Sequence, residues 1–324
     1  MSKEPGLSDE SLRHCLEEQY ALNAATFELL SGGLDVNARV YRVVSEQGDA
    51  YLLKAKQGPF YEPAYRVPRY LRDQGITSVV APLPTREQAL WVTVDRWTLV
   101  LYPFIDGDSS WNPGMDDTYW RSLGAAFKQI HQINQPAEVF QGVRKEAFEL
   151  AEYRRGVRTI EARLAQFVGD SASEQSLYRN WMAYQATIHA VMDSMEKLAD
   201  HLRQQAGPLV ICHADLHTAN IIRTSDGEVF IIDWDDIMLA PRERDFIFVG
   251  DAQAADPPAP FFQGYGEVAF DWRALKYYRL ERVIQDLIED ASQVLFRADL
   301  DDETKIGAAR LLEANLLERD WERL

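Results

Sequence analysis

The chain has 324 residues, of which 46% are hydrophobic and 26% are charged. This length suits two lobes with a sizeable buried core, and this composition excludes an intrinsically disordered chain. The formal net charge is −17 at pH 7, which disfavours nucleic acid and anionic membranes as partners and leaves cationic small molecules open. Acidity also keeps a protein soluble, so the charge alone does not choose a partner.

The chain has two cysteines, Cys15 and Cys212, which form neither a CxxC pair nor a metal-ligand cluster. Scattered thiols of this kind are typical of a reducing compartment. The first residues lack the apolar run of a secretion signal, and no stretch approaches about 18 uninterrupted apolar residues. We therefore expect a cytoplasmic protein without a transmembrane helix.

Strand patterns dominate the first hundred residues after a helix expected over 8–20, for which Ser8 is the N-cap. Two runs rich in β-branched and aromatic residues, 40–44 and 51–54, flank a turn at 48–49 and predict a hairpin.

A second helix is expected over 62–74, although Pro68 lies inside its pattern and weakens it. Three further apolar runs, at 79–80, 90–94 and 98–102, have the character of strands. This region is therefore expected to be a mainly antiparallel sheet with a helix packed on it.

A change of architecture is expected at 103–107, where proline and glycine predict a hinge. Beyond the hinge the pattern is helical over 116–133, 145–165, 175–205 and 271–323, with one β segment over 209–234. The predicted fold is α+β, with two lobes over residues 1–104 and 105–324.

The β segment carries the chemistry, because its strands lead into Asp215, Asn220 and Asp233. Phosphoryl transfer needs positioning, Mg²⁺ to neutralise the phosphates and a carboxylate near the attacking hydroxyl group. Asn220 and Asp233 offer the oxygen ligands that Mg²⁺ prefers, and Asp215 can accept the hydroxyl proton. The interval from Asp215 to Asn220 equals that of the kinase catalytic loop.

Each of these residues alone has an ordinary structural explanation, such as a turn or a helix cap. We interpret His213 as a hydrogen-bonded structural residue and assign no chemistry to His217. The combination of H-x-D-x-H-x-x-N, a turn at 226–227 and an apolar pair before Asp-Trp-Asp is much harder to obtain by chance.

With these motifs the chain resembles the aminoglycoside phosphotransferase and choline kinase-like superfamily, and more narrowly the spectinomycin phosphotransferases. The resemblance covers nearly the whole chain and is carried by residues 32–38, 51–54, 102–105, 231–235, 238–245, 264–267 and 277–282. It implies the two-lobed protein-kinase-like fold, with a small antiparallel sheet as nucleotide-binding lobe and a larger helical lobe with the catalytic loop and substrate site.

The resemblance also implies roles for particular residues. Asp215 would be the catalytic base, and Asn220 and Asp233 would bind Mg²⁺. Lys54 would bind the α- and β-phosphates of ATP and would be held by Glu62, at the start of the following helix.

Further roles concern the nucleotide pocket. Tyr102 and Phe104 would belong to the hinge that meets the adenine ring, and Gly32 and Gly33 would give the phosphate loop its flexibility. Trp234 stands where protein kinases have the Phe of D-F-G, so regulation by a flip of that Phe is not expected.

The expected reaction is the ATP- and Mg²⁺-dependent phosphorylation of a hydroxyl group on a cationic aminocyclitol. Carboxylates and aromatic rings suit such a ligand, and the candidates are Asp235, Asp236, Asp245, Tyr265, Glu281 and Asp286. The alternatives are a metabolic or Ser/Thr kinase of the same fold and a nucleotide-binding module without catalysis. The sequence leaves open the exact substrate, ATP versus GTP as donor, and the oligomeric state.

Overall fold

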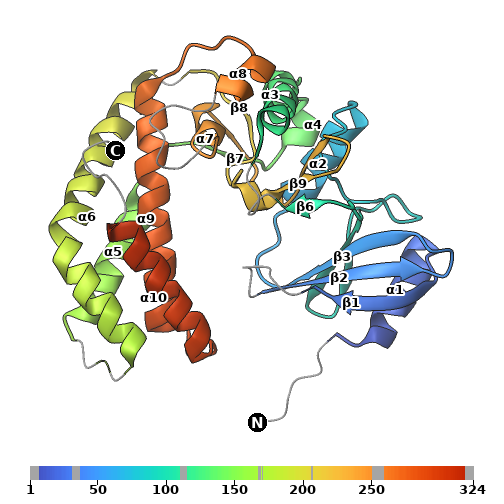
Figure 1. Ribbon diagram of the computed structural model, residues 1–324, viewed down its shortest axis with the longest axis horizontal. Coiled ribbons are helices and arrows are strands. Elements are labelled where there is room, and N and C mark those ends of the chain that lie inside the picture. Colours follow the sequence, from blue (N-terminus) through green and yellow to red (C-terminus); the bar gives the residue numbers. More distant parts are fainter. Residues whose placement is uncertain are drawn as a thin grey trace. The chain divides into compact units, whose positions relative to one another are not determined.

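The computed structural model describes residues 7–30, 37–109, 115–166, 169, 171–205, 207–249 and 259–317. The chain divides into two compact units. The first comprises the described parts of Met1–Arg144, Ile211–Met238 and Pro258–Glu267. The second comprises those of Lys145–Val210, Leu239–Pro257 and Val268–Leu324. The mixture of an antiparallel sheet with many helices confirms the predicted fold class (Figure 1).

The first unit is built on a five-stranded antiparallel sheet in the order β1-β2-β3-β5-β4. Its strands are β1 (Ala24–Leu29), β2 (Ala38–Ser45), β3 (Ala50–Lys56), β4 (Val92–Val94) and β5 (Trp97–Pro103). The predicted hairpin is confirmed, since β2 pairs with β3 and Tyr41 lies opposite Leu53. In β3, Leu53 and Ala55 are buried, so Lys54 between them projects from the other face.

One helix precedes the strands of this sheet in the sequence, and a second lies between β3 and β4. Helix α1 (Asp9–Tyr20) begins as predicted, because Ser11 N–H donates to the side chain of Ser8 at 3.1 Å. Its apolar residues pack with those of β2, β3 and β5 in one hydrophobic core, and Figure 1 shows α1 beside this sheet. Helix α2 (Pro63–Asp73) forms despite the internal Pro68, which is buried.

The rest of the first unit consists of short strands and helices. These are β6 (Asp108–Ser109), α3 (Asp117–Gln132), α4 (Ala137–Phe140), the 3₁₀ turn η1 (Thr218–Asn220), β9 (Ile221–Arg223), β10 (Val229–Ile231) and α8 (Ala259–Tyr265). Strands β10, β9 and β6 form a small sheet. Helices α3 and α8 approach so closely at Gly124 that a Cβ atom there would collide with the carbonyl oxygen of Phe261.

The chain passes between the two units within β7 (Arg144–Lys145), β8 (Val210–Cys212) and β11 (Met238–Ala240). This division differs from the predicted boundary at residue 104, because the catalytic segment belongs to the same compact unit as the sheet. The two functional lobes, 1–104 and 105–324, therefore stay a prediction.

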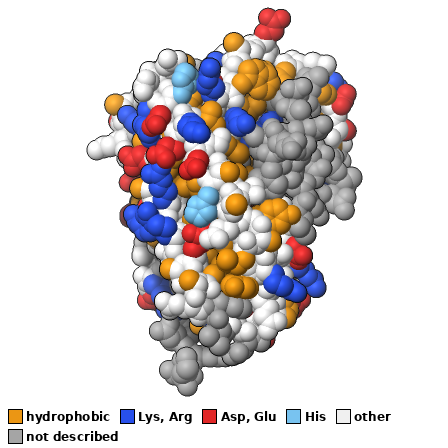
Figure 2. Space-filling model, turned by 90° about the vertical axis from the view of Figure 1, so that its left-hand side faces the viewer, with side chains coloured by type: hydrophobic (Ala, Val, Ile, Leu, Met, Phe, Trp, Pro, Cys, Tyr) orange, Lys and Arg blue, Asp and Glu red, His pale blue; other side chains and the backbone are white. Residues whose placement is uncertain are grey.

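Figure 2 shows one face of the molecule, on which Lys and Arg side chains lie among Asp and Glu side chains. In the described part of the chain, no helix combines the length and the apolar character needed to cross a membrane.

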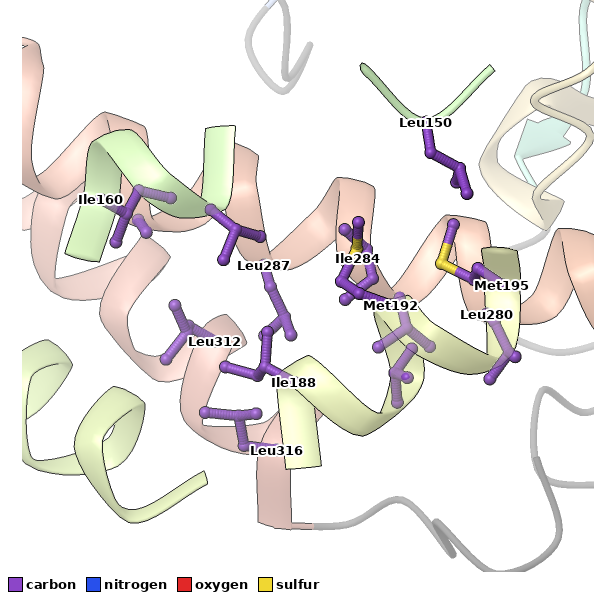
Figure 3. Close-up of a cluster of buried hydrophobic side chains, with 14 of the residues drawn as sticks. Leu150, Ile160, Ile188, Met192, Met195, Leu280, Ile284, Leu287, Leu312 and Leu316 are labelled. Atoms are coloured by element: carbon purple, nitrogen blue, oxygen red, sulfur yellow. The ribbon is translucent and has the colours of Figure 1, made fainter. Parts of the chain in front are cut away.

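The second unit is a helical bundle. It contains α5 (Ala151–Leu164), α6 (Ala172–Gln205), α7 (Glu243–Phe246), α9 (Trp272–Phe296) and α10 (Asp302–Leu317). Figure 3 shows how α5, α6, α9 and α10 bring Ile160, Ile188, Leu287 and Leu312 into one buried cluster. Burial of this apolar surface is what stabilises the long helices, since helical propensity alone contributes little.

The helical stretch predicted over 271–323 is interrupted between α9 and α10. Arg297 pairs with Asp299, at 2.7 Å between Nη2 and Oδ2, and so closes a turn after α9. Asp301 then accepts a hydrogen bond from Thr304 N–H at 2.7 Å and caps α10. These local side-chain bonds explain the break.

A buried ion cluster lies within the second unit. Arg244 Nη1 lies 2.5 Å from Glu281 Oε2 and 3.4 Å from Glu146 Oε2. Tyr277 donates its hydroxyl hydrogen to Glu281 at 3.3 Å. Burial raises the pKa of Glu146, and the nearby carboxylate of Glu281 raises it further, while Arg244 opposes both effects. The guanidinium group of Arg244 thus forms ion pairs with both buried carboxylates.

We predict that Arg244→Leu lowers the free energy of unfolding by about 3–5 kcal/mol, because it leaves both carboxylates buried without a cation. Urea unfolding followed by circular dichroism measures this change. The control is Arg310→Leu, an exposed position on α10, for which we expect a change within about 0.5 kcal/mol. Equal effects of the two substitutions would contradict the assigned role of Arg244.

Candidate active site

The predicted catalytic segment, residues 209–234, folds back on itself so that its polar residues meet. Strands β9 and β10 pair antiparallel, with Ile231 opposite Ile221. Asn220 directly precedes β9 and Asp233 follows β10, and Ile232 N–H donates to the carbonyl oxygen of Asn220 at 3.0 Å. Two residues that are far apart in the sequence motif therefore lie at the same end of the hairpin.

His213 joins the two loops of this site. The ring is fully buried; its Nε2 lies 2.9 Å from the carbonyl oxygen of Ile232, and its Nδ1 accepts a hydrogen bond from Asp215 N–H at 3.3 Å. The ring also packs edge-on against Trp234, with 4.7 Å between centroids. This is the structural role that we predicted for His213.

Two residues of the site have a left-handed backbone. Ala214 has φ 69° and Asp233 has φ 61°. For a residue with a Cβ atom this conformation costs about 1–2 kcal/mol, although Asp tolerates it better than Ala. Such strain is found where the surrounding structure must aim a functional side chain, and here it falls at Asp233 and directly before Asp215.

The side chains of the catalytic loop contact one another. Asn220 Nδ2 donates to the carbonyl oxygen of Asp215 at 2.8 Å. His217 Nε2 lies 3.4 Å from Asp215 Oδ2 and 3.2 Å from Asn220 Nδ2. From the sequence we assigned no chemistry to His217, yet His217 contacts both Asp215 and Asn220. The signal was its place two residues after Asp215 in H-x-D-x-H.

An ion-pair network links β3 to the loop after β10. Lys54 Nζ lies 2.9 Å from Asp233 Oδ1 and 3.0 Å from Asp235 Oδ2, and Lys56 Nζ lies 2.6 Å from the same Asp235 oxygen. Burial alone lowers the pKa of Lys54, but the two carboxylates outweigh it and raise the pKa above its usual value. Burial alone raises the pKa of Asp235, but the two ammonium groups lower it to about 2.

The expected contact between Lys54 and Glu62 is corrected by the structure. Glu62, at the start of α2, pairs with Arg66 one helical turn later. Arg66 also donates from Nε to the carbonyl oxygen of Val139 at 2.9 Å. Because Asp233 and Asp235 hold Lys54 instead, a role of Glu62 in nucleotide binding is left as a prediction.

The residues predicted for the adenine pocket lie at the end of β5. Val100 is the partner of Lys54 in the sheet, and Tyr102 is two residues further on the same face. Burial raises the pKa of Tyr102 above its usual value. The Phe104 ring lies 5.0 Å from the guanidinium carbon of Arg42. Gly32 and Gly33 lie outside the described residues.

The six residues predicted to line the substrate pocket do not all lie in one unit. Asp235 and Asp236 lie two and three residues after Asp233, and Asp236 Oδ1 lies 3.3 Å from Arg144 Nη2. Tyr265, in α8, is buried against His131, with 2.9 Å between the hydroxyl group and Nδ1. Asp235 is held by two lysines, so of these three only Asp236 is an exposed carboxylate.

The other three candidates belong to the second unit. Asp245 is fully buried, and Glu281 is buried in the cluster around Arg244. Asp286 pairs with Arg282, one turn earlier on α9, at 2.8 Å. Each of these carboxylates is thus buried or paired within its own unit. Their contact with a substrate stays a prediction.

Solved structures similar to this chain include phosphotransferases and kinases. Spectinomycin phosphotransferase APH(9)-Ia in complex with ADP and spectinomycin is 28% identical, with a TM-score of 0.86 over 99% of this chain and 100% of the other. The AMP-bound complex of the same enzyme is 26% identical, with a TM-score of 0.79 over 94% and 98% of the two chains. The ethanolamine kinase of Plasmodium vivax is 15% identical over 98% and 91%, with a TM-score of 0.63, which shows a shared fold. No curated protein matches the sequence.

Taken with these structures, the fold and the site define an ATP-dependent phosphotransferase that acts on a hydroxyl group of a small molecule. The model of the phosphotransferase enzyme family, APH, matches residues 26–278, which is most of the chain. The chain belongs to this family.

We predict that Asp235→Asn lowers the free energy of unfolding at pH 7 by about 1–3 kcal/mol, because Lys54 and Lys56 each lose a carboxylate contact. The matched control is Asp236→Asn, which removes an exposed pair and should cost less than about 1 kcal/mol. Urea unfolding measures both.

The pH dependence of this difference has a definite sign. The pKa of Asp235 is about 2 in the folded chain, below its ordinary value of 3.8. The stabilisation by its carboxylate is therefore complete above about pH 4 and is lost as the pH falls toward 2. The gap between wild type and Asp235→Asn should shrink between pH 7 and pH 3; a gap that grows on acidification would refute this assignment.

Proposed function

We propose that the chain transfers the γ-phosphoryl group of ATP to a hydroxyl group of a cationic aminocyclitol, and that spectinomycin or a close relative is the acceptor. The observation that carries this proposal is the similarity, over the whole length of both chains, to a spectinomycin phosphotransferase solved with ADP and spectinomycin. The sequence motif from Asp233 to Asp245 supports the same acceptor.

In this proposal Asp215 is the catalytic base. Its carboxylate takes the proton of the acceptor hydroxyl group while that oxygen bonds to the γ-phosphorus and the bond to the β–γ bridging oxygen breaks, which releases ADP. Three features of the structure support this role. Asp215 is held by the contact of its backbone with His213, by Asn220 and by the left-handed backbone of Ala214. Such positioning supplies much of the rate in phosphoryl transfer.

The donor atoms beside Asp215 suit Mg²⁺. The carboxamide oxygen of Asn220 and the carboxylate of Asp233 are hard oxygen ligands, and the Asn220 side chain is oriented by its amide nitrogen. We propose that these two residues hold the ion. When bound, Mg²⁺ would neutralise phosphate charge during the transfer.

Lys54 is the proposed phosphate ligand. Its ammonium group lies beside Asp233, so a nucleotide whose phosphates reach this lysine also reaches the proposed magnesium ligand. Asp233 and Asp235 keep the lysine protonated. Tyr102 and Phe104, at the end of the neighbouring strand, are the proposed contacts of the adenine ring.

Asp236 is the proposed carboxylate for an amine of the acceptor. It is exposed, follows the proposed metal ligand by three residues, and its contact with Arg144 is half exposed on both sides. The amines of an aminocyclitol are protonated at neutral pH, so a carboxylate here would help to hold one hydroxyl group near Asp215.

We also propose a cytoplasmic location, which the two scattered thiols support.

The test is an assay with ATP, Mg²⁺ and each of spectinomycin, choline and ethanolamine, with mass detection of the product. We predict that wild type adds one phosphoryl group to spectinomycin, and that Asp215→Asn lowers kcat by about 10²–10⁴-fold while nucleotide affinity stays near that of wild type.

Different results would overturn different parts of the proposal. Phosphorylation of choline or ethanolamine without any mass gain on spectinomycin would replace the acceptor and keep the chemistry. Turnover by Asp215→Asn within a few-fold of wild type would remove Asp215 from the role of base.

A further inference from the structure

The second unit has a pocket that none of the proposed kinase residues lines. Its volume is about 760 Å³, which falls in the range of small-molecule sites. The pocket lies where the C-terminal end of α6 and the N-terminal end of α9 come to the same end of the bundle (Figure 1). Its walls come from three stretches of the chain, 198–208, 241–243 and 269–276.

Basic side chains predominate in the lining. Arg242, Arg273, Lys276 and His201 contribute to it. Within the described part of the chain, the side chains of Arg273, Lys276 and His201 form no ion pair or hydrogen bond, and Arg273 and Lys276 are exposed.

The two carboxylates of the lining are already engaged by the protein. Glu243 is buried and accepts a hydrogen bond from Asp271 N–H at 3.1 Å, and it lies 4.0 Å from Arg242. Asp271 caps α9 by accepting from Arg273 N–H at 2.9 Å and from Ala274 N–H at 3.3 Å. The helix terminus is therefore satisfied by its own cap, and the charge that the pocket offers to a ligand comes from basic side chains.

Aromatic rings complete the lining. Trp272 has an exposed fraction of 53%, which is high for so large an apolar side chain. Its ring lies 5.2 Å from that of Phe270, at an interplanar angle of 32°. An indole supported in this way offers a flat surface on which a planar ring can stack.

We propose that this pocket binds a small organic anion with a planar ring, such as an aromatic carboxylate, sulfonate or phosphate ester. The ring would stack on Trp272, and the anionic group would meet Arg273 and Lys276. The overall negative charge does not prevent this, because charges beyond about 8 Å are largely screened at physiological ionic strength. Under our proposal the active site takes a cationic acceptor, whereas this pocket would take an anion. Anion binding here does not depend on the proposed phosphotransferase activity.

The experiment uses the full chain and the fluorescent probe pyrenetetrasulfonate, followed by fluorescence anisotropy with ADP present to occupy the nucleotide site. We expect saturable binding. Arg273→Glu and Lys276→Glu should each weaken binding about tenfold or more, since they reverse a charge at the pocket. Trp272→Ala should weaken it several-fold. The matched control is Arg310→Glu, an exposed charge reversal on α10, which should leave binding within about twofold of wild type.

Several outcomes would overturn the proposal. Absence of saturable binding would do so, as would an equal loss in Arg310→Glu, which would show a general effect of net charge. Inorganic phosphate that displaces the probe as well as an aromatic sulfonate would show that the ring makes no contribution. Unfolding midpoints of all four variants within about two degrees of wild type confirm that a loss of binding is not a loss of folding.

Discussion

The ion pairs of Lys54 and Lys56 with Asp233 and Asp235 are the interaction on which the arrangement of the site depends. The two lysines alternate with buried residues on β3 and so project from one face of the sheet. The two carboxylates alternate in the same way on the loop after β10. Opposite charges in equal number meet at 2.6–3.0 Å, which avoids the large cost of a partly buried charge without a partner. Segments 179 residues apart are thereby fixed against each other.

Under our proposal, the same ion pairs compete with the phosphates and the Mg²⁺ ion of a nucleotide. Lys54 cannot give its full charge to a phosphate while two carboxylates surround it, and Asp233 cannot give its full charge to Mg²⁺ while it holds Lys54. Under our proposal, a nucleotide that arrives with Mg²⁺ would supply a new partner to both residues at once, so neither charge would be left without a counter-ion. Asp235 would keep its contact with Lys56 in either case.

The sequence predicted the parts of this structure that depend on near neighbours. The Ser8 cap and the hairpin of β2 and β3 are local patterns, and the structure places both as expected. The pairing of Glu62 with Arg66 was also available, because the residues are one helical turn apart. The partners of Asp235 and Glu281 were not, since they come from distant segments that only tertiary packing brings together. Nor does any local pattern predict a left-handed backbone at Ala214.

We propose that Asp233 exchanges Lys54 for a magnesium-bound nucleotide, and titration calorimetry of ADP with and without Mg²⁺ tests this exchange. For Asp233→Ala we predict that affinity for Mg-ADP falls about tenfold or more. Affinity for Mg-free ADP should hold or rise, because Lys54 loses a competing carboxylate. An Asp233→Ala chain that binds Mg-ADP as tightly as wild type would contradict the account.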